Sequence, residues 1–139
     1  MSKYSQVASL LQDYIQKEDR CCLLSLKPEY AEKILSGRKR YEYRRRCFQA
    51  DVTKIFLYAT KPKGEIIGYF YPGRILLDKP EIIWEKTNKY SGLDEDDFWA
   101  YCRDIRNLYA ISVSGAVRFS KPVNPYQIDF RPPQSYYYI

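Results

Sequence analysis

Apolar positions near the start of the chain recur at helical spacing. They stand at i, i+3, i+4, i+7 and i+8, namely at Val7, Leu10, Leu11, Tyr14 and Ile15. This spacing predicts an amphipathic helix, and the charged stretch 17–20 ends it. We therefore expect residues 1–20 to form an extra N-terminal helix that packs on a single domain formed by residues 21–139.

The next two apolar segments predict a strand followed by a helix. Cys21–Leu26 is a short apolar run that ends at Lys27 and Pro28, and proline is favoured in the first turn of a helix. Four apolar residues then give that helix one stripe, at Tyr30, Ala31, Ile34 and Leu35. Gly37 stands where a left-handed C-terminal cap is expected, so the helix ends there.

The segment 37–46 carries charges in a defined order. It holds six basic residues and a single acid, Glu42. Because side chains alternate along an extended strand, Glu42 and Arg44 share one face, and the tyrosines on either side of Glu42 face the other way. Lys39 lies an odd number of residues from Glu42, so strand parity alone leaves its direction open.

The middle of the chain predicts a curved sheet. Lys54–Thr60 contains successive apolar residues, which is typical of a strand covered on both faces. A Lys-Pro-Lys-Gly turn leads into the run Glu65–Tyr71, so these two segments are expected to form a hairpin. Pro72 and the glycine after it indicate a bend or bulge before Arg74–Leu77. A bent strand of this kind favours a curved sheet or a small barrel.

The last third mixes helical and strand patterns. The segment 80–106 is expected to be helical in part, with Asp94 as an N-cap and further acids in the first turn. Tyr109, Ile111 and Val113 alternate with small residues, which predicts a half-buried strand. The tail 122–139 is rich in proline and is expected to be irregular.

Composition limits the architecture and suggests the charge of the partner. The 139 residues, with 45% apolar and 17% aromatic content, suffice for one buried core and not for two. A net charge of +6 favours an anionic partner. The charge is segregated, because residues 1–50 hold 11 Lys and Arg against 6 Asp and Glu, whereas residues 78–106 hold 8 acids and 5 bases. We therefore expect a basic face.

Cysteine and histidine usage excludes the usual structural zinc site. The four cysteines form no CxxC pair, and the chain has no histidine, so no metal site is predicted. No apolar stretch approaches the roughly 20 residues that span a bilayer, and the N-terminus lacks an apolar signal core. These observations predict a cytoplasmic protein with reduced thiols and no membrane contact.

The motif in segment 37–46 resembles that of a known family. Gly37, Lys39, Glu42 and Arg44 match the Gly-x-Lys-x-x-Glu-x-Arg pattern of the ASCH domain, the activating signal cointegrator homology family. The segment Ser25–Pro28 before the first helix and the C-terminal segment 133–136 are also similar to those of ASCH domains. The resemblance covers residues 21–139 and implies an α+β fold, a small PUA-like mixed β-barrel flanked by a few helices.

The resemblance also implies a cleft beside the first helix of the barrel that binds RNA or a modified nucleotide. The expected binding residues are Lys27, Gly37, Lys39, Glu42, Arg44, Thr60, Gln134 and Ser135. An arginine fork grips phosphate at two points, lysine adds a point charge, and a carboxylate accepts from a base amino group. The alternative is that Glu42 and Arg44 form an ion pair that only orders the strand.

Aromatic residues are candidates for stacking on bases. The chain has 15 tyrosines and two tryptophans, and aromatic side chains beside basic grooves bind single-stranded RNA. Five of them fit the core of a small barrel better than a ligand site, namely Tyr41, Tyr43, Tyr58, Trp84 and Trp99. A protein partner is a further alternative, and the sequence specifies neither such a partner nor the oligomeric state.

Two enzymatic readings stay open, and Lys39 and Glu42 are the candidate catalytic residues if the protein is an enzyme, joined by Arg44 in the case of RNA cleavage. Some ASCH-like proteins are acetylcytidine amidohydrolases that use Lys, Thr and Glu, but they place Thr where this chain has Glu42, so Thr60 would have to supply the hydroxyl. Relatives of the family have also been proposed to cleave RNA with the help of a divalent metal. The acidic cluster 94–97 could bind Mg or Mn, although its position at a helix start favours capping. No other cofactor is expected.

Overall fold

The computed structural model describes residues 3–49 and 51–139, which form a curled sheet with helices at its faces and ends. The helices are α1 (Lys3–Leu10), α2 (Pro28–Leu35), α3 (Pro80–Thr87) and α4 (Glu95–Tyr101), with short 3-10 turns η1 (Gln12–Tyr14), η2 (Asn88–Tyr90) and η3 (Pro125–Ile128). The strands are β1 (Cys21–Leu26), β2 (Tyr41–Arg44), β3 (Lys54–Ala59), β4 (Glu65–Asp78), β5 (Leu108–Val123) and β6 (Tyr136–Tyr138).

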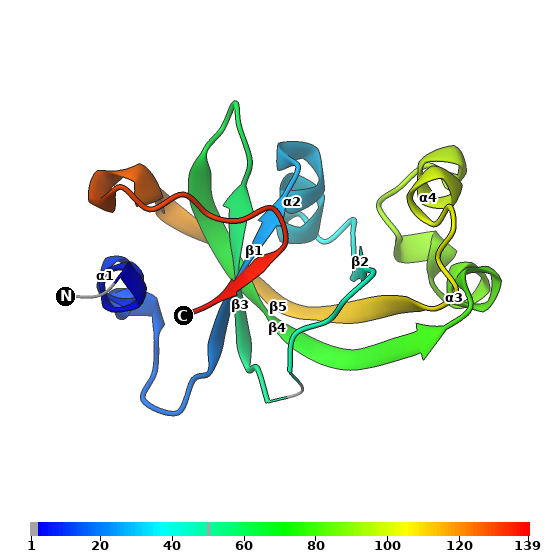
Figure 1. Ribbon diagram of the computed structural model, residues 1–139, viewed down its shortest axis with the longest axis horizontal. Coiled ribbons are helices and arrows are strands. Elements are labelled where there is room, and N and C mark those ends of the chain that lie inside the picture. The colour runs from blue at the N-terminus through cyan, green and yellow to red at the C-terminus, as the bar shows by residue number, and fades with distance from the viewer. Residues whose placement is uncertain (1–2, 50) are drawn as a thin grey trace.

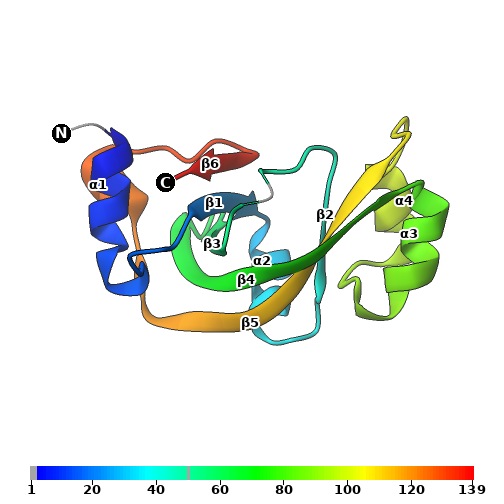
Figure 2. The ribbon, with the colours of Figure 1, turned by 90° about the horizontal axis from the view of Figure 1, so that it is seen from below.

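The six strands form one mixed sheet in the order β2-β5-β4-β3-β1-β6. β1 and β3 run parallel, and the neighbouring pairs are antiparallel. The pairing of β4 with β5 shifts register between Pro72 and Ile75, at the bend that the sequence predicts, and both long strands curve along their length (Figure 2). The α+β fold class is confirmed, as a six-stranded half-barrel with β2 and β6 at its edges.

The two central strands are buried on both faces. All residues of β1 and β3 are buried, as the continuous apolar runs predict. Leu24 and Leu57 pack toward α2, in a cluster with Ala31 of that helix. Leu23 and Phe56 pack in the opposite cluster, where Val7 of α1 is fully buried. The sheet therefore divides the core into two layers, with α1 and α2 on different sides (Figure 1).

A third cluster anchors α3 and α4 against the sheet, at the end of β4 and β5 far from α1 (Figure 1). The ring of Tyr43 on β2 meets Phe98 of α4 edge-on at 5.1 Å between ring centroids. Ala110 of β5 is buried in this cluster, and the next residue, Ile111, is buried in the cluster under α2. The prediction of a half-buried β5 is therefore wrong at this point, because helices cover both faces of the strand there.

Two terminal predictions need correction. The N-terminal α-helix ends at Leu10 rather than near Ile15, and the chain continues as η1, where Tyr14 stacks on Phe119 at 4.0 Å. The C-terminal tail is not wholly irregular, because it ends in β6, which pairs antiparallel with β1. Sequence alone missed β6 because three consecutive tyrosines carry no alternation of apolar and polar residues.

Candidate functional site

A cleft of about 680 Å³ opens between the start of α2, the edge strand β2 and α4. Segments far apart in sequence form its walls, because α3 and α4 lie beyond the end of β2 (Figure 1). The lining residues are Ser25, Leu26, Lys27, Glu29, Tyr30, Lys39, Glu42, Tyr43, Arg44, Leu93, Asp97, Ala100 and Tyr101. The cleft therefore contains three residues of the Gly-x-Lys-x-x-Glu-x-Arg motif, Lys39, Glu42 and Arg44.

Lys39 is a buried cation at the base of this cleft. Only 1% of its surface is exposed, and its Nζ donates to the carbonyl oxygen of Ser91 at 2.7 Å. The same Nζ lies 3.7 Å from Oε1 of Glu42. It also lies 4.8 Å from the ring centroid of Tyr43 and 5.6 Å from that of Tyr30. The two aromatic faces partly replace the water that the ammonium group has lost.

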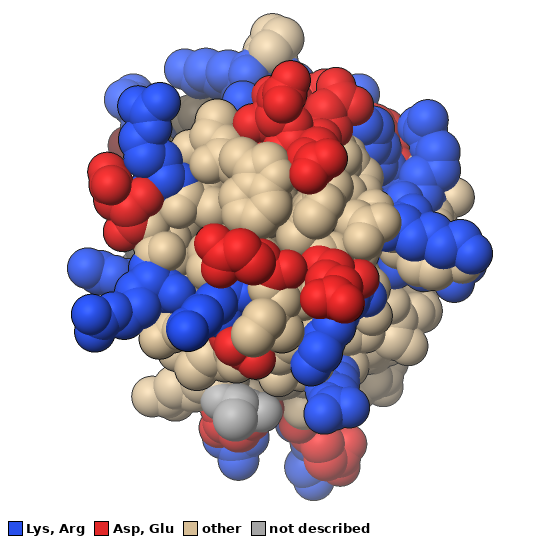
Figure 3. All heavy atoms as spheres, turned by 90° about the vertical axis from the view of Figure 1, so that its right-hand side faces the viewer, with Lys and Arg blue, Asp and Glu red and all other residues tan. Residues whose placement is uncertain are grey.

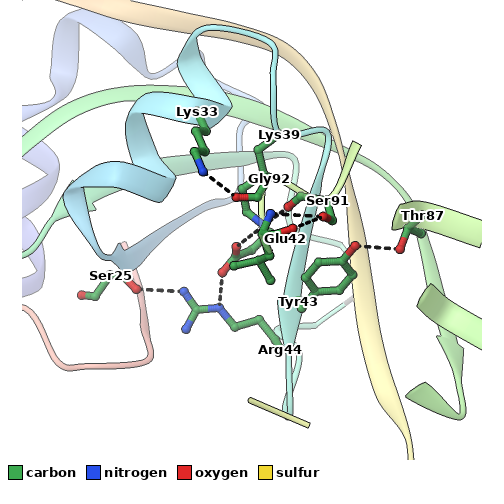
Figure 4. A network of polar contacts seen from close by, with 10 residues as sticks. Ser25, Lys33, Lys39, Glu42, Tyr43, Arg44, Thr87, Ser91 and Gly92 are labelled. Carbon is green, nitrogen blue, oxygen red and sulfur yellow. Dashed lines mark hydrogen bonds and ion pairs between the residues drawn. The ribbon is translucent and has the colours of Figure 1, made fainter. Parts of the chain in front are cut away.

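Glu42 bridges two cations. Its Oε2 lies 2.9 Å from Nε of Arg44, while its Oε1 faces Lys39 (Figure 4). The guanidinium of Arg44 also donates through an Nη atom to the carbonyl oxygen of Ser25 at 2.8 Å, which links β2 to the end of β1. The exposed fraction of the side chain rises from 1% for Lys39 and 7% for Glu42 to 14% for Arg44. Arg44 is therefore the member of this network that a ligand reaches most readily.

Burial lowers the pKa of Lys39 from 10.5 to about 8. The loss of hydration is the largest cause, and the nearby charge of Glu42 opposes it by favouring the ammonium form. Arg44 and Lys33 add to the lowering, because they place further positive charge nearby. An amine with this pKa exchanges its proton close to neutral pH, which an exposed lysine does not do.

The turn at Gly92 holds Lys39 in place. Gly92 has a φ of +71°, and a Cβ built there would lie 2.6 Å from Cβ of Lys39. Nζ of Lys33 on α2 donates to the Gly92 carbonyl oxygen at 2.9 Å, so the same turn is fastened to the helix. A glycine is required here because the lysine stem passes directly over the backbone.

Tyr30, Tyr43 and Tyr101 provide the aromatic part of the cleft wall. Tyr43 is buried and its hydroxyl is 2.7 Å from Oγ1 of Thr87, which ties β2 to α3. Tyr101 is 36% exposed, and Tyr30 is partly exposed. Tyr43 therefore belongs to the core, as predicted, whereas Tyr30 and Tyr101 present ring surface to a ligand.

Of the other predicted site residues, some line this cleft and some do not. Lys27 is exposed at its rim. Gly37 adopts φ +82° after α2 and orients the chain without lining the cleft. Thr60 follows β3, where its amide donates to the carbonyl oxygen of Leu26, and it does not line the cleft either.

The tail segment of the predicted site lies beside the cleft. The amide of Ser25, a lining residue, donates to the carbonyl oxygen of Ser135 at 3.1 Å, and its hydroxyl donates to that of Pro133. Gln134 stands between these two contacts and is exposed. The tail therefore supports the Ser25 carbonyl that receives Arg44, although its own side chains do not line the cleft.

Sequence reasoning missed the contribution of α4. Asp97 and Tyr101 both line the cleft and stand four residues apart, which places them on the same face of the helix. This four-residue spacing on a predicted helix is the sequence signal that could have placed both residues in one site. Asp94 is the N-cap residue of α4 and acids fill the first turn, as predicted, although no side-chain capping hydrogen bond of Asp94 is formed within the described residues.

The charge around the cleft is mixed rather than uniformly basic. Figure 3 shows acidic side chains gathered toward the middle and top of the α3–α4 end, with Lys and Arg at both sides of the view. Within residues 3–49 and 51–139, no three His, Cys, Asp or Glu side chains are grouped so that they could hold a metal ion. No helix in the described part of the chain is long and apolar enough to cross a membrane.

The fold and the cleft together define a PUA-like domain with a motif-lined cleft. The family model for the ASCH domain matches residues 24–111, which is more than half of the chain. The protein therefore belongs to the ASCH family, as the motif predicts.

Known relatives agree with this assignment. An ASCH domain-containing ribonuclease from Zymomonas mobilis is 30% identical over 122 residues, covering 81% of this chain and 80% of that protein. The crystal structure of ASCH from Zymomonas mobilis matches with a TM-score of 0.79 at 27% identity, over 86% of this chain and 87% of that one. The N-terminal domain of Staphylothermus marinus McrB shares only the fold, with a TM-score of 0.50 at 10% identity over 78% of each chain.

Proposed function

We propose that this protein binds RNA and that the cleft between α2, β2 and α4 receives a nucleotide. The observation that carries the proposal is the Lys39–Glu42–Arg44 network at the base of a cleft flanked by partly exposed tyrosines. Fixed charge beside accessible aromatic rings is the combination that single-stranded RNA recognition uses. The net charge of +6 adds a general attraction for a polyanion.

The geometry changes the expected roles of the two motif cations. Lys39 is too deeply buried to grip a phosphate, and its amine is already engaged by Ser91 and Glu42. It therefore acts as a positioning residue that orients the Glu42 carboxylate. Arg44, with Lys27 at the rim, contacts phosphate, and Glu42 accepts hydrogen bonds from a base amino group.

Fluorescence anisotropy with a labelled ten-nucleotide single-stranded RNA tests this proposal. The titration is run at 50 mM and 200 mM salt with the wild type, Arg44→Gln and Arg131→Gln, since Arg131 is an exposed arginine of the tail and outside the cleft. Arg44→Gln should weaken binding about tenfold or more and flatten the salt dependence, because a phosphate contact is lost. Equal affinities for the three proteins would contradict the proposed cleft.

RNA cleavage is the second candidate function. The relative from Zymomonas mobilis is a ribonuclease, and Lys39 has a pKa of about 8 in contact with Glu42. A lysine with that pKa can hold or release a proton near neutral pH, which general acid–base catalysis requires. In this reading Glu42 accepts the proton of the 2′-hydroxyl as that oxygen attacks the phosphorus, and the bond to the 5′-oxygen breaks, with the leaving oxygen taking a proton from water. The buried Lys39 exchanges the proton with Glu42, and Arg44 stabilises charge on the phosphate.

The cleavage reading has its own test. The RNA is incubated with the wild type and with Lys39→Met and is then resolved by length, with and without EDTA. Shortened RNA with the wild type alone would establish cleavage, and loss of cleavage in EDTA would assign it to a divalent metal. Intact RNA in every sample would leave the protein a binding module.

The amidohydrolase alternative receives no support from the geometry. It requires a hydroxyl nucleophile beside Lys39, and Thr60, the residue predicted for that role, does not line the cleft. Ser25 does line it, but its hydroxyl donates to the carbonyl oxygen of Pro133 in the tail.

A further inference from the structure

Two arginine–tyrosine pairs stand at the two ends of β2. The guanidinium carbon of Arg40 lies 4.7 Å from the ring centroid of Tyr90, and that of Arg45 lies 5.6 Å from the ring centroid of Tyr101. Both arginines are exposed, and Tyr90 and Tyr101 are 37% and 36% exposed as residues. Each pair therefore offers a cation and an aromatic surface to solvent at the same place.

Backbone contacts hold both pairs in a defined geometry. The amide of Arg40 donates to the carbonyl oxygen of Tyr90 at 2.8 Å, and its own carbonyl oxygen accepts from the amide of Val113 on β5. An Nη atom of Arg45 donates to the carbonyl oxygen of Tyr101 at 3.2 Å. Both pairs thus join the ends of β2 to the α3–α4 end of the molecule. The backbone bonds fix the position of Arg40 beside Tyr90, and the side-chain hydrogen bond fixes the guanidinium of Arg45.

The charges of these arginines are not neutralised by acids. Among the described residues, the ion pairs include those of Arg20 with Asp51 and Arg118 with Glu32, but none includes Arg40 or Arg45. A guanidinium over a ring face retains N–H donors at its edge, and Arg45 uses one Nη on the Tyr101 carbonyl oxygen and keeps its other donors for a ligand. A phosphate oxygen is the ligand that such a fork binds at two points.

The location of the pairs relates them to the cleft. Tyr101 itself lines the cleft, and Tyr90 precedes Ser91, whose carbonyl oxygen receives Lys39 at the cleft base. Five steps of nearly extended chain separate Arg40 from Arg45, which corresponds to roughly 17 Å. That span exceeds a single nucleotide and suits a short length of extended RNA.

We propose that the cleft receives an internal nucleotide of a single-stranded RNA, and that the Arg40–Tyr90 and Arg45–Tyr101 pairs bind the phosphates and bases on either side of it. This inference rests on the proposed function. The ligand of the cleft is then an oligonucleotide rather than a free nucleoside. Single-stranded RNA is required because only unstacked bases can lie on the exposed faces of Tyr90 and Tyr101.

The test combines ligand length with removal of the flanking charges. Anisotropy competition is measured for a mononucleotide, a four-nucleotide and a ten-nucleotide RNA with the wild type. The variants are the double variant Arg40→Gln/Arg45→Gln and the matched control Lys121→Gln/Arg131→Gln. The control removes the same charge from two exposed residues on β5 and the tail, away from the cleft lining. Circular dichroism and urea unfolding check that both variants are folded.

The expected result is an affinity that rises from mononucleotide to decamer in the wild type and falls about tenfold or more for the decamer in the double variant. The slope of log affinity against log salt should become shallower by about 1.4, because two phosphate contacts to a single strand are lost. The control should keep most of the wild-type slope. Tyr90→Leu separately tests stacking and should weaken the decamer more than the mononucleotide.

Two outcomes would overturn the inference in distinguishable ways. Equal wild-type affinities for all three ligands, with equal salt slopes for the double variant and the control, would remove the flanking sites but leave nucleotide binding in the cleft intact. Absence of binding for every RNA at 50 mM salt would overturn the proposed function together with this inference.

Discussion

The ammonium group of Lys39 lies 3.7 Å from a carboxylate oxygen of Glu42, in a region where both side chains are almost fully buried. The second oxygen of the same carboxylate lies 2.9 Å from Arg44. One acid thus stands between two cations of different accessibility. Because removal from water is costly for each charge, the three groups depend on one another, and changing one alters the others.

Replacing Lys39 with methionine should destabilise the fold by about 3 kcal/mol. Methionine retains most of the volume but leaves Glu42 buried with Arg44 as its remaining cation. Urea unfolding of the wild type, Lys39→Met, Glu42→Gln and the double variant gives the coupling energy between the two groups. Strictly additive losses would show that the two charges do not stabilise each other.

The stability contributed by Lys39 should rise with pH between about 8 and 10.5. Its pKa is about 8 in the folded protein against 10.5 ordinarily, so in that interval the unfolded chain binds more protons. The free energy of unfolding then increases by up to about 1.4 kcal/mol per pH unit from this group.

Other groups oppose this trend, so the effect must be measured as a difference. Burial raises the pKa of Tyr43 to about 12 and that of Cys21 to about 11, so the stability that these two groups contribute to the fold falls as pH rises. The free energy of unfolding of the wild type minus that of Lys39→Met isolates the lysine. A difference that stays flat or falls between pH 8 and 10.5 would be inconsistent with a buried amine of low pKa.

Alanine at Gly92 should be more damaging than alanine at Gly37. Both glycines have positive φ, of +71° and +82°, so each substitution carries backbone strain of about 1–2 kcal/mol. At Gly92 the new methyl group also meets the Lys39 stem at 2.6 Å, whereas at Gly37 no described residue beyond its chain neighbours lies within 4 Å of it. We expect Gly92→Ala, and not Gly37→Ala, to displace Lys39. Gly92→Ala should therefore lower the thermal unfolding midpoint more and should also weaken RNA binding. Similar losses of stability in the two variants would argue against a tight turn over the lysine.

Tyr101→Ala should weaken RNA binding, and Thr60→Ala should not. Tyr101 lines the cleft with a partly exposed ring, and base stacking on such a ring contributes about 1–3 kcal/mol. Thr60 does not line the cleft. Anisotropy titrations of the two variants at the same salt concentration show which of the two residues contributes to the affinity for RNA. A larger loss for Thr60→Ala would move the binding site toward the end of β3.

Local patterns in the sequence were sufficient for much of the fold. The continuous apolar runs of β1 and β3 predicted strands buried on both faces, and Pro28 and Gly37 marked the limits of α2. The period-two rule correctly placed Glu42 and Arg44 on one face, because that relation depends only on the backbone of one strand. The motif also identified the ASCH family.

The composition of the cleft depended on tertiary structure. Asp97 and Tyr101 enter it because α4 folds back across the end of β2, more than fifty residues away in sequence. Thr60, which the family resemblance placed in the site, lies outside the lining, whereas Ser25 and Leu26 at the end of β1 enter it because the sheet curls and brings them toward β2. Neither fact follows from local spacing, since each depends on how distant segments pack.

The sequence by itself determined most of the elements, the family and the identity of the three charged motif residues. Only the tertiary structure decided how those charges are used, because the pKa and accessibility of a side chain depend on what surrounds it. Burial under the Gly92 turn makes Lys39 a partner of Glu42 and Ser91, while Arg44 remains partly open. Desolvation is a property of packing, and packing is set by contacts between residues that are remote along the chain.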